Sequence, residues 1–445
     1  MSNQIRLNLN LQTAGRHDAA WKTLEDTSRL VSDVDYYVEA ARLAEAGRLD
    51  AIFLADSLGS LSENSVRRPW RGLDPTVLQT AIARDTERIG LISTIPALYG
   101  HPFLVARAIA SLDHASKGRA AWNIITSQNP PTLDALGAGS VQLDHDTRYR
   151  KAEEFVGIVT SLWDSLPHEA IVDDREHDLY IDESLTKPIS YRGEFFASEG
   201  VLPLPGAFRG QRPVLFQAGA SEHSRRFGAR WADALFTGQR TRQLARRFRT
   251  HVRELAVSYG RNPKGLLVFP GLWVIVGASE SEAQERKAHL DSLLDADHLL
   301  EQLAERLDLP VSALDPDSAL PYAKLSDTPS STLVARHREQ IVTEAKEKDL
   351  TVRQLLFNNL TGGHRVLIGT PEQIADDIIE WVDEGAADGF NINVDVLPDG
   401  LQRFIDGPVA ELQRRGRFRT EYEHATFREN LGIADLSHDH EGALK

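Results

Sequence analysis

The residues best suited to chemistry lie at Gly219, Ala220 and Ser221, between an apolar run and an amphipathic segment. The run 214–216 predicts a buried strand, and Ser221 can cap the start of a helix that continues to Arg230. Small residues at such a turn leave backbone N–H groups free, and a helix N-terminus attracts anions. This spacing suits a phosphate site, although an ordinary capped helix in a β/α fold would look the same.

Other polar side chains stand near the ends of predicted strands or at the start of a helix. Asp56, Thr94 and Asn123 each lie near the end of an apolar run. His145 and Tyr149 are four residues apart at the start of a predicted helix, so they share one of its faces. Each residue alone has an ordinary structural explanation. Together with the phosphate site, these hydroxyl, amide and carboxylate groups suit a phosphorylated planar cofactor that carries the reaction chemistry.

The elements that position these residues alternate between strand and helix along the chain, which indicates an α/β protein with a parallel sheet. The simplest such arrangement is a closed (β/α)₈ TIM barrel with insertions, whose ligand site lies at the carboxyl ends of its strands. An open doubly wound sheet is the alternative, but no GxGxxG motif follows an early strand. The eight predicted strands are residues 5–11, 51–57, 89–100, 118–125, 214–216, 234–236, 266–276 and 390–394.

We expect residues 1–415 to form one barrel domain with two insertions. A hairpin insertion is expected near 170–205, and a helical insertion near 296–360 would form a lid over the barrel mouth or a dimer arm. Residues 416–445 are polar and are expected to be a loosely packed C-terminal extension. Their SHDHEG stretch is expected to be solvated rather than to bind a metal.

The composition excludes several classes of function. The formal charge of −15 argues against a nucleic-acid or anionic-membrane surface. The absence of cysteine excludes disulfides, thiolate catalysis and cysteine-ligated zinc. No apolar run reaches the length of a membrane span and no signal peptide is recognised, so a cytoplasmic location is expected. No Walker loop, HExxH or EF-hand motif is present, and no metal site is predicted.

Five stretches together resemble the luciferase-like flavin-dependent monooxygenases. The resemblance is to the branch that contains nitrilotriacetate, dibenzothiophene-sulfone and long-chain-alkane monooxygenases. The stretches occur in the family's order from about residue 5 to 415. They are FLADS, LISTIPALYGHPFLVARAIASLDHASKGRAAWNIITS, DHDTRYRKAEEF, PVLFQAGASEHSRRFGARWADALFTG and GTPEQIADDIIEWVDEGAADGFNI.

The resemblance implies that FMN, as FMNH₂, is the cofactor and assigns roles to the rim residues. Asp56 and Thr94 would lie near the isoalloxazine, and Asn123 would approach its polar edge. The roles of the remaining three follow the same resemblance: His145 and Tyr149 would line the cofactor cleft, and Ser221 would hold the phosphate.

The resemblance also implies a two-component reaction. A separate NAD(P)H:FMN reductase would supply FMNH₂, and O₂ would form a C4a-(hydro)peroxyflavin that oxygenates a small organic substrate. Such chemistry requires exclusion of water, for which the 296–360 insertion is the candidate. It also requires a proton donor, and His17 in the loop after the first strand is the candidate. The family suggests a homodimer or homotetramer.

Two alternatives to this function stay open at this point. One is an F420-dependent oxidoreductase of the same superfamily, and the other is a flavin-binding protein without turnover. The substrate is weakly indicated by sulfur sparing, because the chain has no cysteine and one methionine. That composition favours a sulfone or sulfonate acquired during sulfur scavenging. An anionic aminopolycarboxylate would instead need an arginine cluster at the rim, where Arg67 and Arg68 are expected to be merely solvated.

Overall fold

A computed structural model describes most of the chain, in nine stretches. These are residues 4–56, 58, 66–126, 130–137, 143–206, 208–219, 221–325, 332–358 and 364–433. Ala220 and the SHDHEG stretch, both considered above, lie outside the described residues. None of the helices within these stretches combines the length and apolar character that a bilayer crossing requires.

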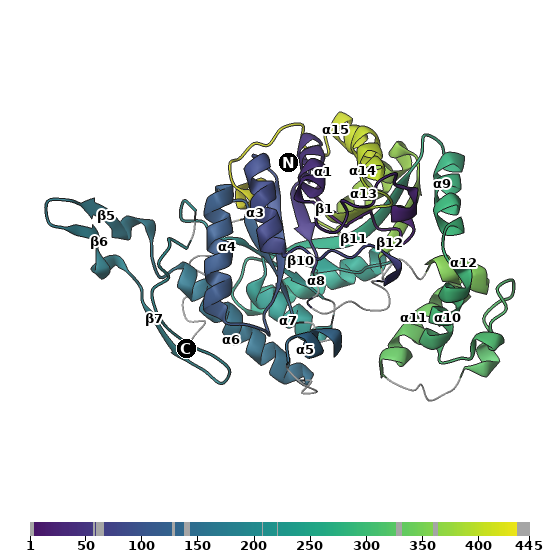
Figure 1. Ribbon diagram of the computed structural model, residues 1–445, viewed down its shortest axis with the longest axis horizontal. Coiled ribbons are helices and arrows are strands. Elements are labelled where there is room, and N and C mark those ends of the chain that lie inside the picture. The colour runs from purple at the N-terminus through teal and green to yellow at the C-terminus, as the bar shows by residue number, and fades with distance from the viewer. Residues whose placement is uncertain are drawn as a thin grey trace.

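Eight parallel strands form a closed barrel at the centre of the molecule (Figure 1). They follow the order β10-β9-β4-β3-β2-β1-β13-β11, and pairing of β10 with β11 closes the ring. The predicted barrel is therefore confirmed, and the open sheet is excluded. The strands are β1 (Leu7–Asn10), β2 (Ala51–Leu54), β3 (Gly90–Pro96), β4 (Ala120–Ile125), β9 (Val214–Ala218), β10 (Ala234–Thr237), β11 (Leu267–Val276) and β13 (Phe390–Val394).

A further strand, β12 (Arg365–Gly369), was not predicted. β11 has ten residues, and its first four pair with β10 while its later residues pair with β13 and β12. β12 therefore occupies the edge of β11 that β10 leaves free beyond Pro270. The apolar run in RVLIG is too short for its periodicity to identify a strand distinct from the preceding insertion.

The helices surround the barrel and begin at the expected capping residues. The Asp74 side chain accepts hydrogen bonds from the backbone N–H groups of Thr76 and Val77, as the Asp-Pro start signal predicts. Asp144 caps the long helix α6 in the same way. The helices on the barrel are α1 (Val34–Ala46), α3 (Pro75–Asp85), α4 (Pro102–Ser116), α6 (His145–Trp163), α7 (Glu222–Trp231), α8 (Arg242–Ser258), α9 (Glu280–Ser292) and α13 (Pro371–Asp383).

Two β-hairpins project from the barrel within residues 170–205, on the left of Figure 1. β7 (Ile189–Arg192) pairs with β8 (Ala197–Gly200) in the segment where a hairpin is predicted. β5 (Ile171–Asp174) and β6 (Leu179–Ile181) form another hairpin, which was not predicted. The described part of the insertion near 296–360 contains α10 (Ala296–Leu307), α11 (Thr332–Lys348) and α12 (Val352–Asn358).

These three helices form a lobe with a hydrophobic core of its own, on the right of Figure 1. Leu303 and Leu307 of α10 pack in this core with Ile341 of α11 and Leu355 of α12. All four side chains are almost fully buried. The lobe therefore has an apolar core separate from that of the barrel, and α9 leads from the barrel into it.

Part of the C-terminal segment closes the base of the barrel, at the amino ends of the strands. Phe427 and Leu431 are buried with Phe53, Phe216 and Phe269, whose side chains fill the barrel interior. The expectation of a loosely packed tail is therefore wrong for this segment. The burial of these apolar side chains is not evident from the sequence, because the residues around them are polar. Those polar residues pair with charged groups of the barrel that are distant in sequence.

Three aspartates at this base each precede a strand and bind both an arginine and a neighbouring strand. Asp50, Asp233 and Asp388 accept the backbone N–H groups of Leu7, Leu215 and Val268, at 2.6, 2.9 and 2.9 Å. The arginine partners are Arg419 for Asp50, Arg428 for Asp233, and Arg249 with Arg253 for Asp388. The same arrangement thus recurs three times around the base.

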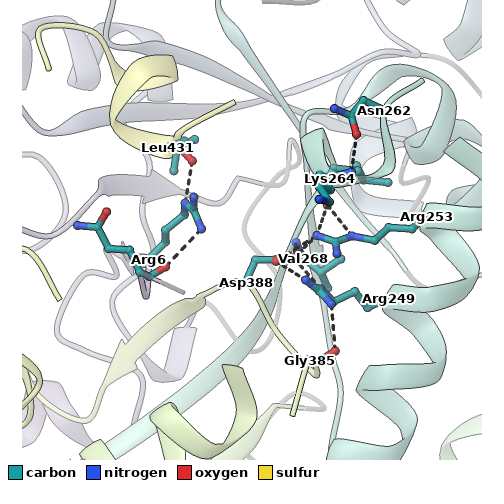
Figure 2. Close-up of polar contacts among 11 residues, drawn as sticks. Arg6, Arg249, Arg253, Asn262, Lys264, Val268, Gly385, Asp388 and Leu431 are labelled. Carbon is teal, nitrogen blue, oxygen red and sulfur yellow. Dashed lines mark hydrogen bonds and ion pairs between the residues drawn. The ribbon is translucent and has the colours of Figure 1, made fainter. Parts of the chain in front are cut away.

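Figure 2 shows Asp388 held between Arg249 and Arg253 of α8. Burial alone would raise the pKa of Asp388, but the two arginines outweigh burial and lower it below its ordinary value. Asp50 behaves differently, since burial raises its pKa despite the nearby Arg419. Arg419 and Arg428 belong to the C-terminal segment, and Arg249 and Arg253 belong to α8, so all three arginine sets join outer elements to the base of the barrel.

Candidate active site

Thr94 and Asn123 lie side by side on the inner wall at the carboxyl end of the barrel. They are partners in the register of β3 and β4, and the Asn123 side-chain amide donates to the Thr94 hydroxyl oxygen at 2.9 Å. Both side chains are buried. The Asn123 Oδ1 atom is buried without a hydrogen-bond partner among the described residues. A buried unpaired acceptor at a barrel mouth can accept a hydrogen bond from a polar ligand or from water.

Four asparagines on the adjoining wall were not recognised from the sequence. Asn8 and Asn10 of β1 donate to the side-chain oxygens of Asn391 and Asn393 of β13, at 2.8 and 2.9 Å. Asn10 Oδ1 also has no hydrogen-bond partner among the described residues. The signal was present in LNLN and FNIN, where asparagines alternate with apolar residues. That period of two directs the asparagines into the barrel and the apolar residues toward the helices.

Asp56 follows β2 and borders a pocket of about 290 Å³. Arg71 lies beside it, and burial lowers the pKa of Arg71 while the Asp56 carboxylate opposes that shift. Arg71 donates to the Leu11 carbonyl oxygen at 2.6 Å. The pocket is lined by residues 12–18, Trp21, Ala55, Asp56 and residues 68–71.

His17 lines the same pocket, but both of its ring nitrogens are engaged. Its Nδ1 atom accepts the backbone N–H of Ala19 at 3.1 Å, which places the ring proton on Nε2. Nε2 lies 3.1 Å from Asp291 Oδ1, and Lys287 pairs with the same carboxylate. The role of His17 as a proton donor stays a prediction, and any such role requires Nε2 to exchange Asp291 for a ligand.

His145 and Tyr149 lie together at the start of α6, where they meet His223 of α7. The centroid of the His223 ring is 5.4 Å from that of His145 and 5.7 Å from that of Tyr149. Burial, then the charges of Arg148 and His223, lower the pKa of His145, while His223 pairs with Asp146 at 2.7 Å. His223 was missed from the sequence, although its place two residues after a predicted helix cap could have identified it.

Ser221 caps α7, as the sequence predicts. Its hydroxyl accepts the backbone N–H of Ser224 at 3.3 Å, which leaves the first amides of the helix available to another acceptor. Gly219 has a φ of +154°, and a Cβ there would lie 2.1 Å from Ser224 Oγ. Glycine is therefore required for this close approach of strand and helix. The ring cluster of His145, Tyr149 and His223 stands beside this helix start.

The predicted site residues thus form three neighbouring groups at the carboxyl ends of β2, β3, β4 and β9. Thr94 and Asn123 are hydrogen-bonded, Asp56 adjoins the pocket, and His145 and Tyr149 stand beside the helix that Ser221 caps. The donors and acceptors fit a phosphorylated ring system: helix amides for the anion, aromatic faces beside it, and amide groups for polar ring atoms. The described residues contain no group of histidines and carboxylates that could hold a metal ion.

Comparison with known proteins identifies the family and the fold of the chain. Residues 12–388 match the family described as luciferase-like monooxygenase. The chain is 38% identical over 435 residues to N-acetyl-S-(2-succino)cysteine monooxygenase of Bacillus subtilis (strain 168), covering 97% of each chain. It is 37% identical to nitrilotriacetate monooxygenase component A of Aminobacter aminovorans, again over 97% of each. EDTA monooxygenase from Chelativorans sp. BNC1 superposes with a TM-score of 0.80 at 31% identity, covering 97% of this chain and 99% of that one.

Proposed function

The chain belongs to the luciferase-like monooxygenase family, and we propose on that premise that its barrel mouth binds reduced FMN. The enzyme is a flavin-dependent monooxygenase that inserts one atom of O₂ into a small organic substrate. The observation that carries the choice of FMN is the helix start at Ser221, where the cap hydroxyl accepts the N–H of Ser224 and the positive end of the helix suits a terminal phosphate.

The rim residues divide between the two ends of the cofactor. Ser221 and the first amides of α7 would hold the phosphate, with Tyr149 and His223 beside it. Asn123 and Thr94 would face polar atoms of the ring system, because Asn123 Oδ1 is a buried acceptor with no hydrogen-bond partner in the described part of the chain. Asp56, next to Arg71, would border the ring from the β2 side.

The reduced flavin supplies the two electrons that, with two protons, convert the second oxygen atom of O₂ to water. The protein's own residues bind and orient the cofactor and the substrate, and they exclude water. If solvent had access, the reducing equivalents would be lost as hydrogen peroxide. Below the mouth, the hydrogen-bonded pairs Asn8–Asn391 and Asn10–Asn393 hold their polar groups in fixed positions. His17 remains our candidate for holding a proton at the pocket wall.

A separate NAD(P)H:FMN reductase is the partner that we propose. The relative named component A supports this division of labour, because its name indicates a second component. We also propose a cytoplasmic homodimer or homotetramer. The helical insertion near 296–360 is proposed to restrict solvent at the mouth, because residues of α10 line a pocket there together with Arg16 and Trp21 of the rim.

The F420-dependent alternative is not favoured, because the relatives at 37% and 38% identity are both named monooxygenases. An organosulfur substrate is supported by the low sulfur content of the chain. The name of the relative from Bacillus subtilis, a substituted cysteine monooxygenase, is consistent with it.

Anaerobic titration with FMNH₂ and with reduced F420, followed by rapid mixing with O₂, tests the proposal. We expect tight binding of FMNH₂ and a transient absorbance band after O₂ is added, distinct from the spectra of reduced and oxidised flavin. Binding of F420 without such a band would establish the alternative. Binding of FMNH₂ with no change in its rate of oxidation would indicate a flavin-binding protein without turnover.

A further inference from the structure

A second histidine reaches the barrel mouth, and its contacts differ from those of His17. In His17 both ring nitrogens are engaged, Nδ1 by the backbone N–H of Ala19 and Nε2 by Asp291. In His364 the Nδ1 atom is buried and has no hydrogen-bond partner in the part of the chain that the structure describes. A buried polar atom without a partner costs free energy, so the position of this nitrogen requires an explanation.

His364 directly precedes β12, at the place in the barrel wall where β10 ends. Beyond Pro270, β11 pairs with β12 instead of β10, and Leu272 lies opposite Arg365. The His364 ring lies against Gly271 of β11, since a Cβ at Gly271 would be 2.2 Å from Nδ1 and 2.6 Å from Cε1. The ring therefore occupies the space that any larger residue at position 271 would need.

That space lies on the inner face of the barrel. Gly271 is the register partner of Asn391 of β13, and the side chains of register partners lie on the same face of a sheet. Asn391 faces the interior, where it accepts a hydrogen bond from Asn8. His364 thus supplies, from a separate segment, the inward side chain that β11 lacks at this level.

The His364 ring rests on apolar side chains of the barrel interior. It stacks on Phe236 of β10, with ring centroids 5.4 Å apart and an interplanar angle of 27°. Phe236 in turn contacts Phe53 of β2, at a centroid distance of 5.5 Å. Packing on Gly271 and Phe236 fixes the plane of the imidazole, and neither contact offers Nδ1 a hydrogen bond.

The imidazole of His364 is neutral at physiological pH. Burial, and then the charge of Arg16, lower the pKa of His364 to about 4. In a neutral imidazole one nitrogen carries a hydrogen and the other accepts. Such a ring suits hydrogen bonding to an uncharged polar group of a ligand, and it brings no net charge to the mouth.

Two further polar atoms beside His364 have no partner within the described stretches. They are Nε1 of Trp273, which is two residues along β11 from Gly271 and so on the same face, and Nδ2 of Asn391. Trp273 and Asn391 are 1% and 0% exposed. Three buried groups that can form hydrogen bonds therefore lie together on one part of the barrel wall.

This part of the wall faces Thr94 and Asn123 across the barrel. In the closed ring, four steps separate β11 from β3 in either direction, and four separate β13 from β4. The interior of an eight-stranded barrel is only wide enough for side chains or one small ligand. A ring system held by Thr94 and Asn123 therefore comes within reach of the opposite wall.

We propose that Nδ1 of His364 forms a hydrogen bond to a polar ring atom of the bound reduced flavin, from the wall opposite Thr94 and Asn123. His364 is then a cofactor-contacting residue, and Gly271 is the residue that leaves room for it. This inference rests on the proposed function, because it adds a residue to the same flavin site.

Anaerobic titration with reduced FMN and with reduced riboflavin tests the proposal by affinity. His364→Phe keeps an aromatic ring on Phe236 but removes both nitrogens. It should weaken binding of reduced FMN by about five- to tenfold, as the loss of one neutral hydrogen bond implies. The factor should be the same for reduced riboflavin, because the phosphate takes no part in this contact.

Two amide variants distinguish Nδ1 from the rest of the ring. The amide nitrogen and oxygen of asparagine lie as many bonds from the backbone as Nδ1 does, whereas those of glutamine lie farther out. His364→Asn should therefore recover part of the affinity lost in His364→Phe, and more of it than His364→Gln recovers.

Gly271→Ala provides an independent test, because its Cβ would displace the His364 ring. It should weaken binding of reduced FMN by a similar factor. Combining it with His364→Phe should add little, since both changes remove the same contact. His177→Phe is the matched control, because His177 is 75% exposed on the β5–β6 hairpin. It should leave the affinity unchanged, and circular dichroism should show every variant folded.

Nitrogen NMR of protein that contains isotope-labelled histidine gives a readout independent of affinity. The His364 signal, identified by its loss in His364→Phe, should move when reduced FMN is added, because Nδ1 gains a partner. The His177 signal should stay in place.

The proposal is overturned if His364→Phe binds reduced FMN like wild type, or if the His364 signal is unchanged in protein saturated with reduced FMN. Either failure is distinguishable from failure of the proposed function. If wild type does not bind reduced FMN at all, the flavin site itself is wrong. If wild type binds it normally and a His364 result fails, only the role of His364 is wrong.

Discussion

The Asn123 side chain donates its amide hydrogen to the Thr94 hydroxyl across the β3–β4 boundary, and its own oxygen at the barrel mouth has no hydrogen-bond partner within the stretches that the structure describes. The hydrogen bond fixes the orientation of the amide, because its nitrogen is committed to Thr94. A ligand therefore meets an acceptor whose position is set before binding. Such preorganisation lowers the entropy lost when the complex forms.

Replacing Asn123 by alanine should weaken FMN binding by about tenfold. The variant loses the acceptor that faces the cofactor and also frees the Thr94 hydroxyl, and a buried hydrogen bond contributes about 1 kcal/mol or more. Quenching of flavin fluorescence measures the affinity. Asn262→Ala is the control, since Asn262 only caps a short turn at the base by accepting from Lys264. Equal FMN affinities for Asn123→Ala and wild type would remove Asn123 from the site.

The base of the barrel depends on buried ion pairs, and Arg428→Ala should reduce the free energy of unfolding by about 3–5 kcal/mol. Arg428 and Asp233 are 4% and 2% exposed, so the variant leaves a buried carboxylate without its cation. Chemical denaturation followed by tryptophan fluorescence measures the loss.

Arg353→Ala supplies the comparison for Arg428. Arg353 also binds a carboxylate with two hydrogen bonds, but both it and Asp317 are more than half exposed. Its loss should lower the free energy of unfolding much less than the loss of Arg428, because exposed ion pairs contribute little. Similar losses of the free energy of unfolding in Arg428→Ala and Arg353→Ala would show that the C-terminal segment does not stabilise the base of the barrel.

Asp113 should give the protein a distinctive pH dependence. Burial raises its pKa to about 7, although it accepts the backbone N–H groups of Phe208 and Ala120. A carboxyl group whose pKa is raised by folding binds more protons in the folded state, so its contribution to stability falls as the pH rises from about 4 to 7.

The difference in free energy of unfolding between wild type and Asp113→Asn should therefore decrease over that interval. The slope should reach at most about 1.4 kcal/mol per pH unit, the value for one proton. Comparing the two proteins cancels the groups that titrate in both. A difference that stays constant from pH 5 to 7, or that increases, would contradict the raised pKa.

The alternation of strands and helices predicted the barrel and the rim positions of Thr94, Asn123 and Ser221, because both depend on local periodicity and capping. What the sequence could not predict depends on residues distant along the chain. Arg428 is 195 positions from its partner Asp233, and His17 is 274 from Asp291. Neither pairing has a local signal in the sequence. The closure of the base and the contact of His17 with Asp291 are therefore evident only from the three-dimensional structure.

Arg67 and Arg68 show a different limit of sequence reasoning. Their sequence context predicts that both are merely solvated, whereas Arg67 pairs with Asp295 and Arg68 pairs with Asp18. Arg306 of the insertion and Lys22 of the first loop line the same pocket as Arg67 and Arg68. Charge that accumulates from separate segments is visible only once those segments are placed in space.

The central claim is that the start of α7 binds the phosphate of FMN, and the most direct measurement compares FMN with riboflavin, which lacks the phosphate. Wild type should bind FMN much more tightly than riboflavin, whereas Ser221→Glu, which brings a negative charge to the helix start, should bind both with similar, weak affinity. Thr241→Glu, which places the same charge at the start of α8, should behave as wild type. Equal affinity of wild type for FMN and riboflavin, or an unchanged preference for FMN in Ser221→Glu, would contradict the account.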